Sequence, residues 1–255
     1  MSFCMLFFNI FYLKRLNQKS IMQLVKDGHI LTPQQAFEIY PSLQKIWDHS
    51  NYQDVRLILE KETLSLKYSD YSPFSIDIDQ EVKRHLQFFY KNSPYNELLA
   101  RAIGHKKESP VTNLCDATGG FLSDSIMFIS LGITDLTIYE REVIPSLMIS
   151  NALQRSQYHF HFQSESMNEQ TPYDVIYFDP MYEDKNTKSA PKKAMKVLRD
   201  VIGEDKDSVD QAEKLMVLAR HRFVVKRPIK SKAILPNVSH EIRGKSTRYD
   251  VYINV

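Results

Sequence analysis

Two hydrophobic patterns divide the chain near residue 105. Polar and apolar side chains alternate through residues 54–79, which is typical of hairpin strands that bury one face, so we expect a small antiparallel sheet there. Residues 80–91 repeat apolar side chains at helical spacing, and a second helix is expected over residues 96–103, where Gly104 can end it. The pattern therefore predicts a small α+β N-terminal domain over residues 22–105.

Beyond residue 105 the chain alternates between short apolar runs and longer helical segments. The runs cover Thr112–Ala117, Leu136–Tyr139, Tyr158–Phe162, Val175–Phe178 and Phe223–Val225. This order is typical of a parallel sheet covered on both faces. The last two runs, Val238–Ile242 and Tyr249–Val255, are joined by a stretch too short for a crossover helix, which requires an antiparallel hairpin. We therefore expect residues 106–255 to form one α/β domain with a mostly parallel sheet and an antiparallel C-terminal hairpin.

Residues 1–21 do not fit a targeting segment. The apolar run from Phe3 to Leu13 is shorter than the roughly 20 residues that span a membrane. Its charges, Lys14 and Arg15, follow the run, whereas a signal peptide carries them first. Two interpretations stay open: an apolar N-terminal extension that is buried, or a misassigned start with Met22 as the true initiator.

Charge and cysteine content narrow the class of protein. The 33 Lys and Arg residues nearly balance 31 Asp and Glu, so a net charge of +2 does not by itself indicate a polyanion partner. Cys4 and Cys115 lie far apart, without a CxxC motif or a Cys/His cluster. Such usage is typical of a reduced cytoplasmic protein, and it gives no sign of a metal site.

The first strand of the expected α/β domain runs into a glycine turn, Asp116-Ala117-Thr118-Gly119-Gly120. In open α/β sheets ligands bind beyond the carboxyl ends of the strands, and paired glycines let a ligand approach the backbone. Asp124, at the start of the next helix, can cap that helix or accept a hydrogen bond from an ammonium group. The alternative is a turn that needs its glycines for geometry alone. The fingerprint GxGxxG is absent, which disfavours a nicotinamide cofactor.

The next two strand ends also carry polar residues. Glu140 ends the second strand, where a carboxylate usually binds the ribose hydroxyls of a nucleotide. The alternative is a solvated surface glutamate. Residues 163–166, including Glu165 and Ser166, follow the third strand and could meet an adenine edge or only form a turn.

The end of the fourth strand is the most specific feature. Residues 174–178 (DVIYF) run directly into Asp179-Pro180-Met181-Tyr182. Proline interrupts the ladder, which frees Asp179 to accept hydrogen bonds from an exocyclic amine, while Tyr182 can stack on the base. An ordinary Asp-Pro turn is the alternative. Methyl transfer from a sulfonium to such an amine needs alignment and hydrogen-bond acceptors, and it needs no metal or covalent nucleophile.

Basic residues gather in two stretches, residues 185–199 and 214–232. On one rim of the sheet they would contact phosphates and bind in a salt-dependent way. A solvated helix face is the alternative for Lys192 and its neighbours. Lys226 and Arg227 end a buried strand, so we expect both to point at the same rim as Asp179.

Five motifs in order resemble one known family. They are DATGG at 116–120, YERE at 139–142, YFDPMY at 177–182 followed by KSAPKKAMKVL, RFVVKRP at 222–228 and RYDVY at 248–252. Together they resemble the ribosomal RNA small subunit methyltransferase J family, from about Asp54 to the end of the chain. The resemblance implies a class I, Rossmann-like enzyme that uses S-adenosylmethionine (SAM) to methylate the exocyclic N2 of a guanine in small-subunit (16S) rRNA. The implied partner is this rRNA or the ribosomal subunit.

The resemblance also assigns site residues. It places cofactor contacts on Ser123, Asp124, Glu140, Arg141, Glu165, Ser166 and Asp179. The residue patterns add Asp116, Gly119 and Gly120 to the cofactor site, Asp179, Pro180 and Tyr182 as catalytic residues, and Lys188, Lys192, Lys193, Lys226, Arg227 and Arg248 as RNA contacts.

Two segments depart from the family pattern. The family has DATAGLGRD where this chain has DATGGFLSD, so Leu122 replaces a glycine and Ser123 replaces an arginine. The family's glycine-rich HRRKFGGGRGE stretch is here FFYKNSPYNE. A catalytically silent RNA-binding module therefore stays open as an alternative. Methylation of another planar amine, either adenine N6 or a protein amide, also stays open, because motifs like the one at Asp179 serve several planar amines.

Overall fold

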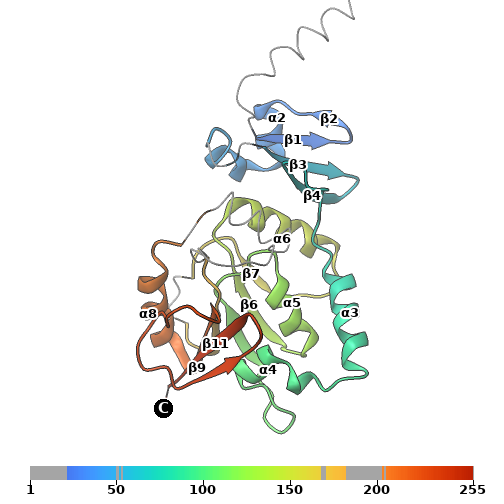
Figure 1. Cartoon of the computed structure of the whole chain (residues 1–255). Coiled ribbons are helices and arrows are strands. Elements are labelled where there is room, and N and C mark those ends of the chain that lie inside the picture. The colour runs from blue at the N-terminus through green and yellow to red at the C-terminus, as the bar shows by residue number, and fades with distance from the viewer. Residues whose placement is uncertain are drawn as a thin grey trace, which may run out of the picture. The chain divides into compact units, whose positions relative to one another are not determined.

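The computed structural model describes residues 22–49, 52, 54–167, 171–181, 203 and 205–254. The chain divides into two compact units, one ending at Ser75 and the other beginning at Ile76. Figure 1 shows the elements of each unit. The expected N-terminal extension, residues 1–21, lies outside the described residues. Within the described ranges, no helix is long and apolar enough to cross a membrane.

Within its described residues, the first unit is a small sheet with one α-helix. Its strands are β1 (Gln23–Lys26), β2 (His29–Ile30), β3 (Val55–Glu60) and β4 (Thr63–Tyr68), in the order β2-β1-β3-β4; α2 (Pro33–Ile39) and a 3-10 helix, η2 (Pro41–Lys45), follow β2. β3 and β4 form the antiparallel hairpin that the alternation predicts, whereas β1 runs parallel to β3. The strand expected after residue 72 is reduced to a single bridge between Leu66 and Phe74.

The second unit contains a seven-stranded sheet in the order β10-β11-β9-β8-β5-β6-β7. The strands are β5 (Asn113–Asp116), β6 (Asp135–Tyr139), β7 (His161–Gln163), β8 (Tyr173–Phe178), β9 (Ala219–Pro228), β10 (His240–Arg243) and β11 (Thr247–Ile253). β5 to β9 are parallel to one another, and β11 and β10 add the predicted antiparallel hairpin. The expected fold class is confirmed.

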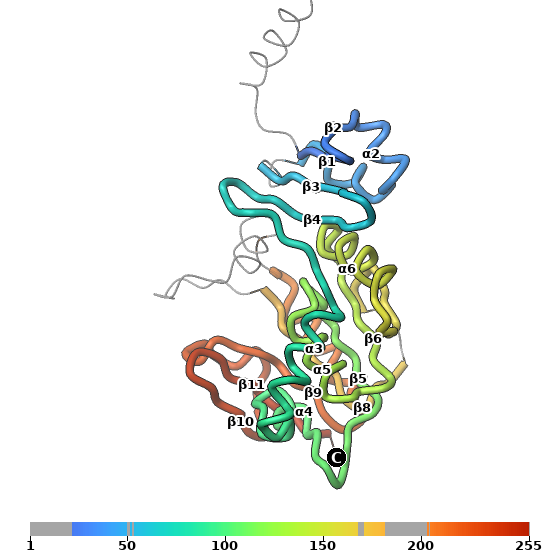
Figure 2. Tube along the Cα trace, turned by 90° about the vertical axis from the view of Figure 1, so that its right-hand side faces the viewer, coloured from blue at the N-terminus to red at the C-terminus, as the bar shows by residue number. Residues whose placement is uncertain are grey.

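Helices cover both faces of this sheet, as Figures 1 and 2 show. They are α3 (Ile78–Phe89), α4 (Leu98–Ile103), α5 (Ser123–Ser130), α6 (Val143–Arg155) and α8 (Ser208–Leu218), with a 3-10 helix, η4 (Pro94–Asn96), before α4. Consecutive strand residues point to opposite faces. The Tyr177 ring therefore meets Phe128 of α5 at 5.2 Å, whereas Phe178 joins Phe223 and Leu215 of α8 in a buried cluster on the other face.

Helix α3 belongs with the large sheet. The sequence pattern assigns α3 and α4 to an N-terminal domain that ends at residue 105, but the structure divides at residue 75. The reason is the amphipathic face of α3: Ile78 and Val82 are buried, and the helix packs along α5 in the second unit. An amphipathic pattern shows that a helix buries one face but does not identify what covers it.

Candidate active site

The strand order places two predicted motifs at the same point of the sheet. The chain builds β5, β6 and β7 outward in one direction and then returns to place β8 and β9 on the other side of β5. Strand order therefore reverses between β5 and β8, and ligands in such sheets bind beyond the carboxyl ends of these strands. β5 ends at Asp116 and β8 ends directly before Asp179.

Asp116 is a buried carboxyl that shapes the glycine turn. It accepts hydrogen bonds from the Thr118 backbone N–H at 3.0 Å and from the Ser125 hydroxyl at 2.5 Å, and it is 1% exposed. Burial raises the pKa of Asp116 to about 7, although both hydrogen bonds act to lower it. Its contacts lie inside the protein, which favours a role in holding the turn.

Gly119 packs tightly against β6. Its N–H donates to the Tyr139 carbonyl at 2.8 Å, and a Cβ at this position would lie 2.8 Å from Cγ2 of Ile138. This glycine is therefore required for close packing between the turn and the neighbouring strand.

Glu140 links the glycine turn to the end of β6. One carboxylate oxygen accepts the Gly120 N–H and the other accepts the Glu142 N–H, each at 2.6 Å. Glu140 is 7% exposed, so the alternative of a solvated surface residue is wrong. Burial raises its pKa to about 7, against the two N–H groups, which favour the ionised form.

Asp179 takes part in a network that also includes Lys226, Asp124 and Tyr177. The Lys226 ammonium lies 2.8 Å from the Asp179 carboxylate and 2.7 Å from that of Asp124, and the Tyr177 hydroxyl donates to Asp124. The Asp179 backbone N–H donates to the Thr118 hydroxyl at 2.7 Å, which ties the end of β8 to the glycine turn. The two motifs of the prediction are thus in direct contact.

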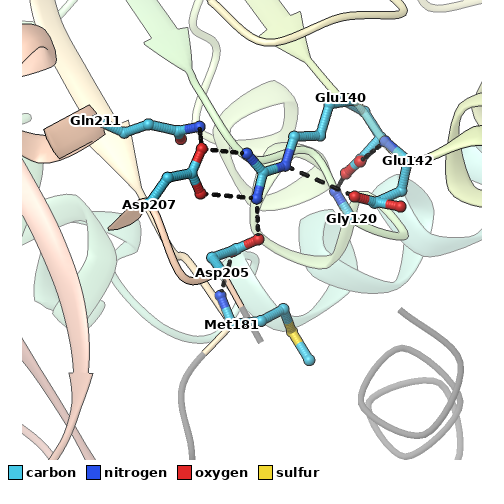
Figure 3. Close-up of polar contacts among 8 residues, drawn as sticks. Gly120, Glu140, Glu142, Met181, Asp205, Asp207 and Gln211 are labelled. Atoms are coloured by element: carbon cyan, nitrogen blue, oxygen red, sulfur yellow. Dashed lines mark hydrogen bonds and ion pairs between the residues drawn. The ribbon is translucent and has the colours of Figure 1, made fainter. Parts of the chain in front are cut away.

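The Arg141 guanidinium is bound to acidic side chains rather than projecting toward the turn. It forms ion pairs with Asp205 and Asp207, the latter at 2.8 Å, and a longer one with Glu142 at 3.6 Å. Asp205 in turn accepts the Met181 N–H at 2.6 Å, as Figure 3 shows. The side chain of Arg141 therefore braces the backbone that follows Asp179 and Pro180.

Leu122 occupies a backbone conformation that suits glycine. It lies at the start of α5 with φ +64°, and its side chain is fully buried. Left-handed backbone costs a non-glycine residue roughly 1–2 kcal/mol. The structure thus gives a physical reason for the glycine that the resembling family has here.

The remaining predicted cofactor residues have fewer described contacts. Ser123 and Glu165 are exposed and Ser166 is half-buried, with Glu165 and Ser166 in the segment that follows β7. Pro180 is buried, and Tyr182 lies outside the described residues.

Lys226, Arg227 and Arg248, the predicted RNA contacts that the structure describes, do not lie on one surface. Lys226 is bound to two acids, and Arg248 is 6% exposed and pairs with Asp250 at 2.6 Å. Arg227 is half-buried, its Nε donates to the Lys232 carbonyl, and it points to the opposite face of β9 from Lys226 because neighbouring strand residues alternate. Lys188, Lys192 and Lys193 lie outside the described residues.

Several residues that the structure brings to the site are not among the predicted site residues. Thr118 binds the Asp179 N–H, Tyr177 binds Asp124, and Asp205 binds Met181. The alternation of side chains along a strand could have predicted that Tyr177 lies on the same face of the sheet as Asp179. Asp205 carried no such signal, because it is 24 residues from its partner Met181 along the chain.

Known proteins are similar to this chain in sequence and in fold. The chain matches the SAM-dependent methyltransferase family over residues 42–254. It is 34% identical over 172 residues to the Ribosomal RNA small subunit methyltransferase J of Marinobacter nauticus, a match that covers 61% of this chain and 62% of the relative. The relative of the same name from Thioalkalivibrio sulfidiphilus is 32% identical over 215 residues, which cover 77% of this chain and 84% of that protein. A solved SAM-dependent methyltransferase from Neisseria gonorrhoeae shares the fold, with a TM-score of 0.57 and 23% identity over 78% of this chain and 82% of that one.

Proposed function

Because the chain belongs to the SAM-dependent methyltransferase family, we propose that it methylates the exocyclic N2 of a guanine in small-subunit rRNA. The names of its relatives support the substrate class. The observation that carries the proposal is the contact between Asp179 and Thr118, which joins the acceptor motif to the glycine turn where strand order reverses. The small ribosomal subunit is found in the cytoplasm, and we expect the protein there.

The glycine turn and Glu140 fit a nucleoside. Each oxygen of the Glu140 carboxylate accepts one described N–H, and a carboxylate oxygen can accept more than one hydrogen bond. Glu140 would therefore accept hydrogen bonds from ribose hydroxyls while it still accepts one from the Gly120 N–H. When bound, SAM supplies a methyl group carried on a positively charged sulfur.

Asp179 would bind the acceptor amine. In the transfer the acceptor nitrogen would use its lone pair to form the new N–C bond while the S–C bonding pair stays with the cofactor's sulfur, and the nitrogen would release one proton to water. Positive charge develops on the nitrogen, so a carboxylate that accepts its N–H groups stabilises the transition state. Pro180 would fix the backbone beside the amine, and Tyr182 would stack on the base.

RNA phosphates would be bound by the remaining basic residues. Arg227, Lys188, Lys192 and Lys193 stay proposed contacts. Binding through such residues weakens as salt concentration rises.

The test compares Asp179→Ala with the wild type. The variant should lose about 10²–10³-fold in methyl transfer to rRNA, the range seen when one charge-stabilising group is removed. Asp210→Ala, an exposed aspartate on α8, is the matched control and should stay active. Calorimetric SAM binding and thermal melting report whether each variant is folded.

Mass spectrometry of digested substrate identifies the product. N2-methylguanosine supports the proposal, whereas methyl groups on adenine N6 or on a protein amide would replace it with another planar-amine acceptor. A wild-type protein that binds RNA without detectable SAM affinity would be a silent binding module.

A further inference from the structure

Lys226 joins two carboxylates from different elements. Its ammonium lies 2.7 Å from Asp124 on α5 and 2.8 Å from Asp179 after β8. Its side chain is 24% exposed, and the two carboxylates are similarly sheltered. Sheltered charges are screened less than surface charges, so these ion pairs hold Lys226 in place.

Strand register brings Lys226 to Asp179. Phe178 pairs with Val225 in the parallel ladder of β8 and β9, so Asp179 and Lys226 are the next residues on the two strands. Both follow the alternation that points Tyr177 toward α5, where Asp124 lies. The contact is therefore a consequence of the sheet and does not depend on a surface loop.

The groups around this pair are mostly acidic. Asp116 at the end of β5 and Asp205 before α8 add negative charge near Asp179. Tyr177 of β8 and Tyr249 of β11 border the network, and Glu97 before α4 acts on Tyr249. Lys226 supplies the positive charge between Asp179 and Asp124, while Asp205 is paired with the Arg141 guanidinium.

Whether Asp179 is ionised depends on two opposing effects, its burial and the charge of Lys226. Burial raises the pKa of Asp179, and the Lys226 ammonium acts in the opposite direction. Burial also acts to lower the pKa of Lys226, but its two carboxylates outweigh burial and hold that pKa well above its usual value.

We propose that Lys226 is a positioning residue for methyl transfer, which keeps the Asp179 carboxylate ionised and oriented. Asp124 binds the same ammonium and helps to hold it in place. In this role Lys226 does not contact RNA phosphate. This inference rests on the proposed function, in which Asp179 accepts hydrogen bonds from the amine. An ionised carboxylate only accepts hydrogen bonds, whereas a protonated one directs a donor at the N–H donors of the amine.

Two substitutions test the proposal with opposite expected signs. Lys226→Met removes the ammonium and should move the acid limb of the pH–rate profile to higher pH, by about one pH unit or more. At a given pH on that limb, the ionised fraction of Asp179 would then be about tenfold smaller. Asp124→Asn keeps a side-chain oxygen that can accept hydrogen bonds from Tyr177 and Lys226, but it removes a negative charge close to Asp179. The acid limb should therefore move to lower pH. Lys226→Arg should restore part of the Lys226→Met loss.

RNA affinity separates positioning from phosphate contact. For Lys226→Met the Kd for rRNA and its salt dependence should match the wild type, while kcat falls. Lys245→Met, an exposed lysine between β10 and β11, is the matched control and should leave the pH profile unchanged. A Lys226→Met variant with the wild-type acid limb, weaker RNA binding and a shallower salt slope would overturn the inference and leave the proposed function standing.

Failure of the proposed function is a different result. If the wild type transfers no methyl group to guanine, the carboxyl ¹³C shift of Asp179 still reports its titration in the protein without substrate. Loss of the Lys226 charge should raise that midpoint, and an unchanged midpoint would contradict the coupling itself. If Lys226→Met does not fold, the downward shift in Asp124→Asn remains the deciding measurement.

Discussion

The backbone N–H of Gly120 donates to the carboxylate of Glu140 over 2.6 Å, so the turn after β5 and the end of β6 hold each other in place. Glu140 is thereby fixed from one side and has acceptor capacity left for a ligand. Burial raises the pKa of Glu140, so we expect the proposed cofactor site to depend on pH near neutrality.

SAM affinity should fall as pH drops below about 7. Burial raises the pKa of Glu140 to about 7, so the carboxylate gains a proton over this range and loses capacity to accept ribose hydroxyls. Calorimetric titration at pH 6 and pH 8 measures the difference. Asp116→Asn should keep this dependence and Glu140→Gln should flatten it; the reverse pattern would move the ribose contact away from Glu140.

Asp116→Asn should stabilise the protein without ligand at neutral pH. Because burial raises the folded pKa of Asp116 to about 7, the wild type loses stability as pH rises from about 4 to about 7. Asn avoids this loss and can keep both hydrogen bonds, since the Ser125 hydroxyl can reverse its role. The gain is at most about 4 kcal/mol above pH 7, at about 1.4 kcal/mol per pKa unit, and vanishes near pH 4. Denaturant unfolding across this range checks it; a gap that is constant with pH would contradict it.

Arg141→Met should loosen the backbone after Asp179 more than it lowers global stability. The guanidinium holds Asp205, and Asp205 holds the Met181 N–H. We expect the exchange protection of that amide to fall about tenfold or more, equivalent to about 1.4 kcal/mol of local opening. Hydrogen exchange read by NMR measures it. Asp207→Asn is the control: Asp207 is 48% exposed, so its loss should change the protection less.

Gly119→Ala should destabilise the second unit by about 1–3 kcal/mol, the usual cost of overpacking. The added Cβ would lie 2.8 Å from Cγ2 of Ile138 and 3.3 Å from the Tyr139 carbonyl. Gly132→Ala is a useful comparison, because its Cβ meets no atom within 4 Å and its cost is backbone strain at φ +84°. Urea unfolding gives both values. If Gly119→Ala leaves stability and SAM binding unchanged, the packing between the turn and β6 is looser than described.

The strand ends could be predicted from the sequence, but most of their partners could not. Apolar runs followed by Asp116, Glu140 and Asp179 mark where strands end, since a buried strand leaves a clear pattern. The partner of Lys226 on α5 is 102 residues away, and nothing local signals it. The end of a buried strand predicts that Lys226 and Arg227 both point at the rim of Asp179, yet the pleat of β9 separates them. The division at residue 75 was also missed, because the pattern of α3 does not reveal that it packs on α5.

The hydrogen bond between Thr118 and Asp179 preorganises the proposed site. The hydroxyl of Thr118 fixes the Asp179 backbone at 2.7 Å, so the spacing between the two halves of the site is set during folding. Reactants that meet in such a frame lose little further freedom at the moment of reaction. A substitution that displaces the Thr118 hydroxyl would therefore slow turnover, while each ligand alone would still bind with its usual affinity.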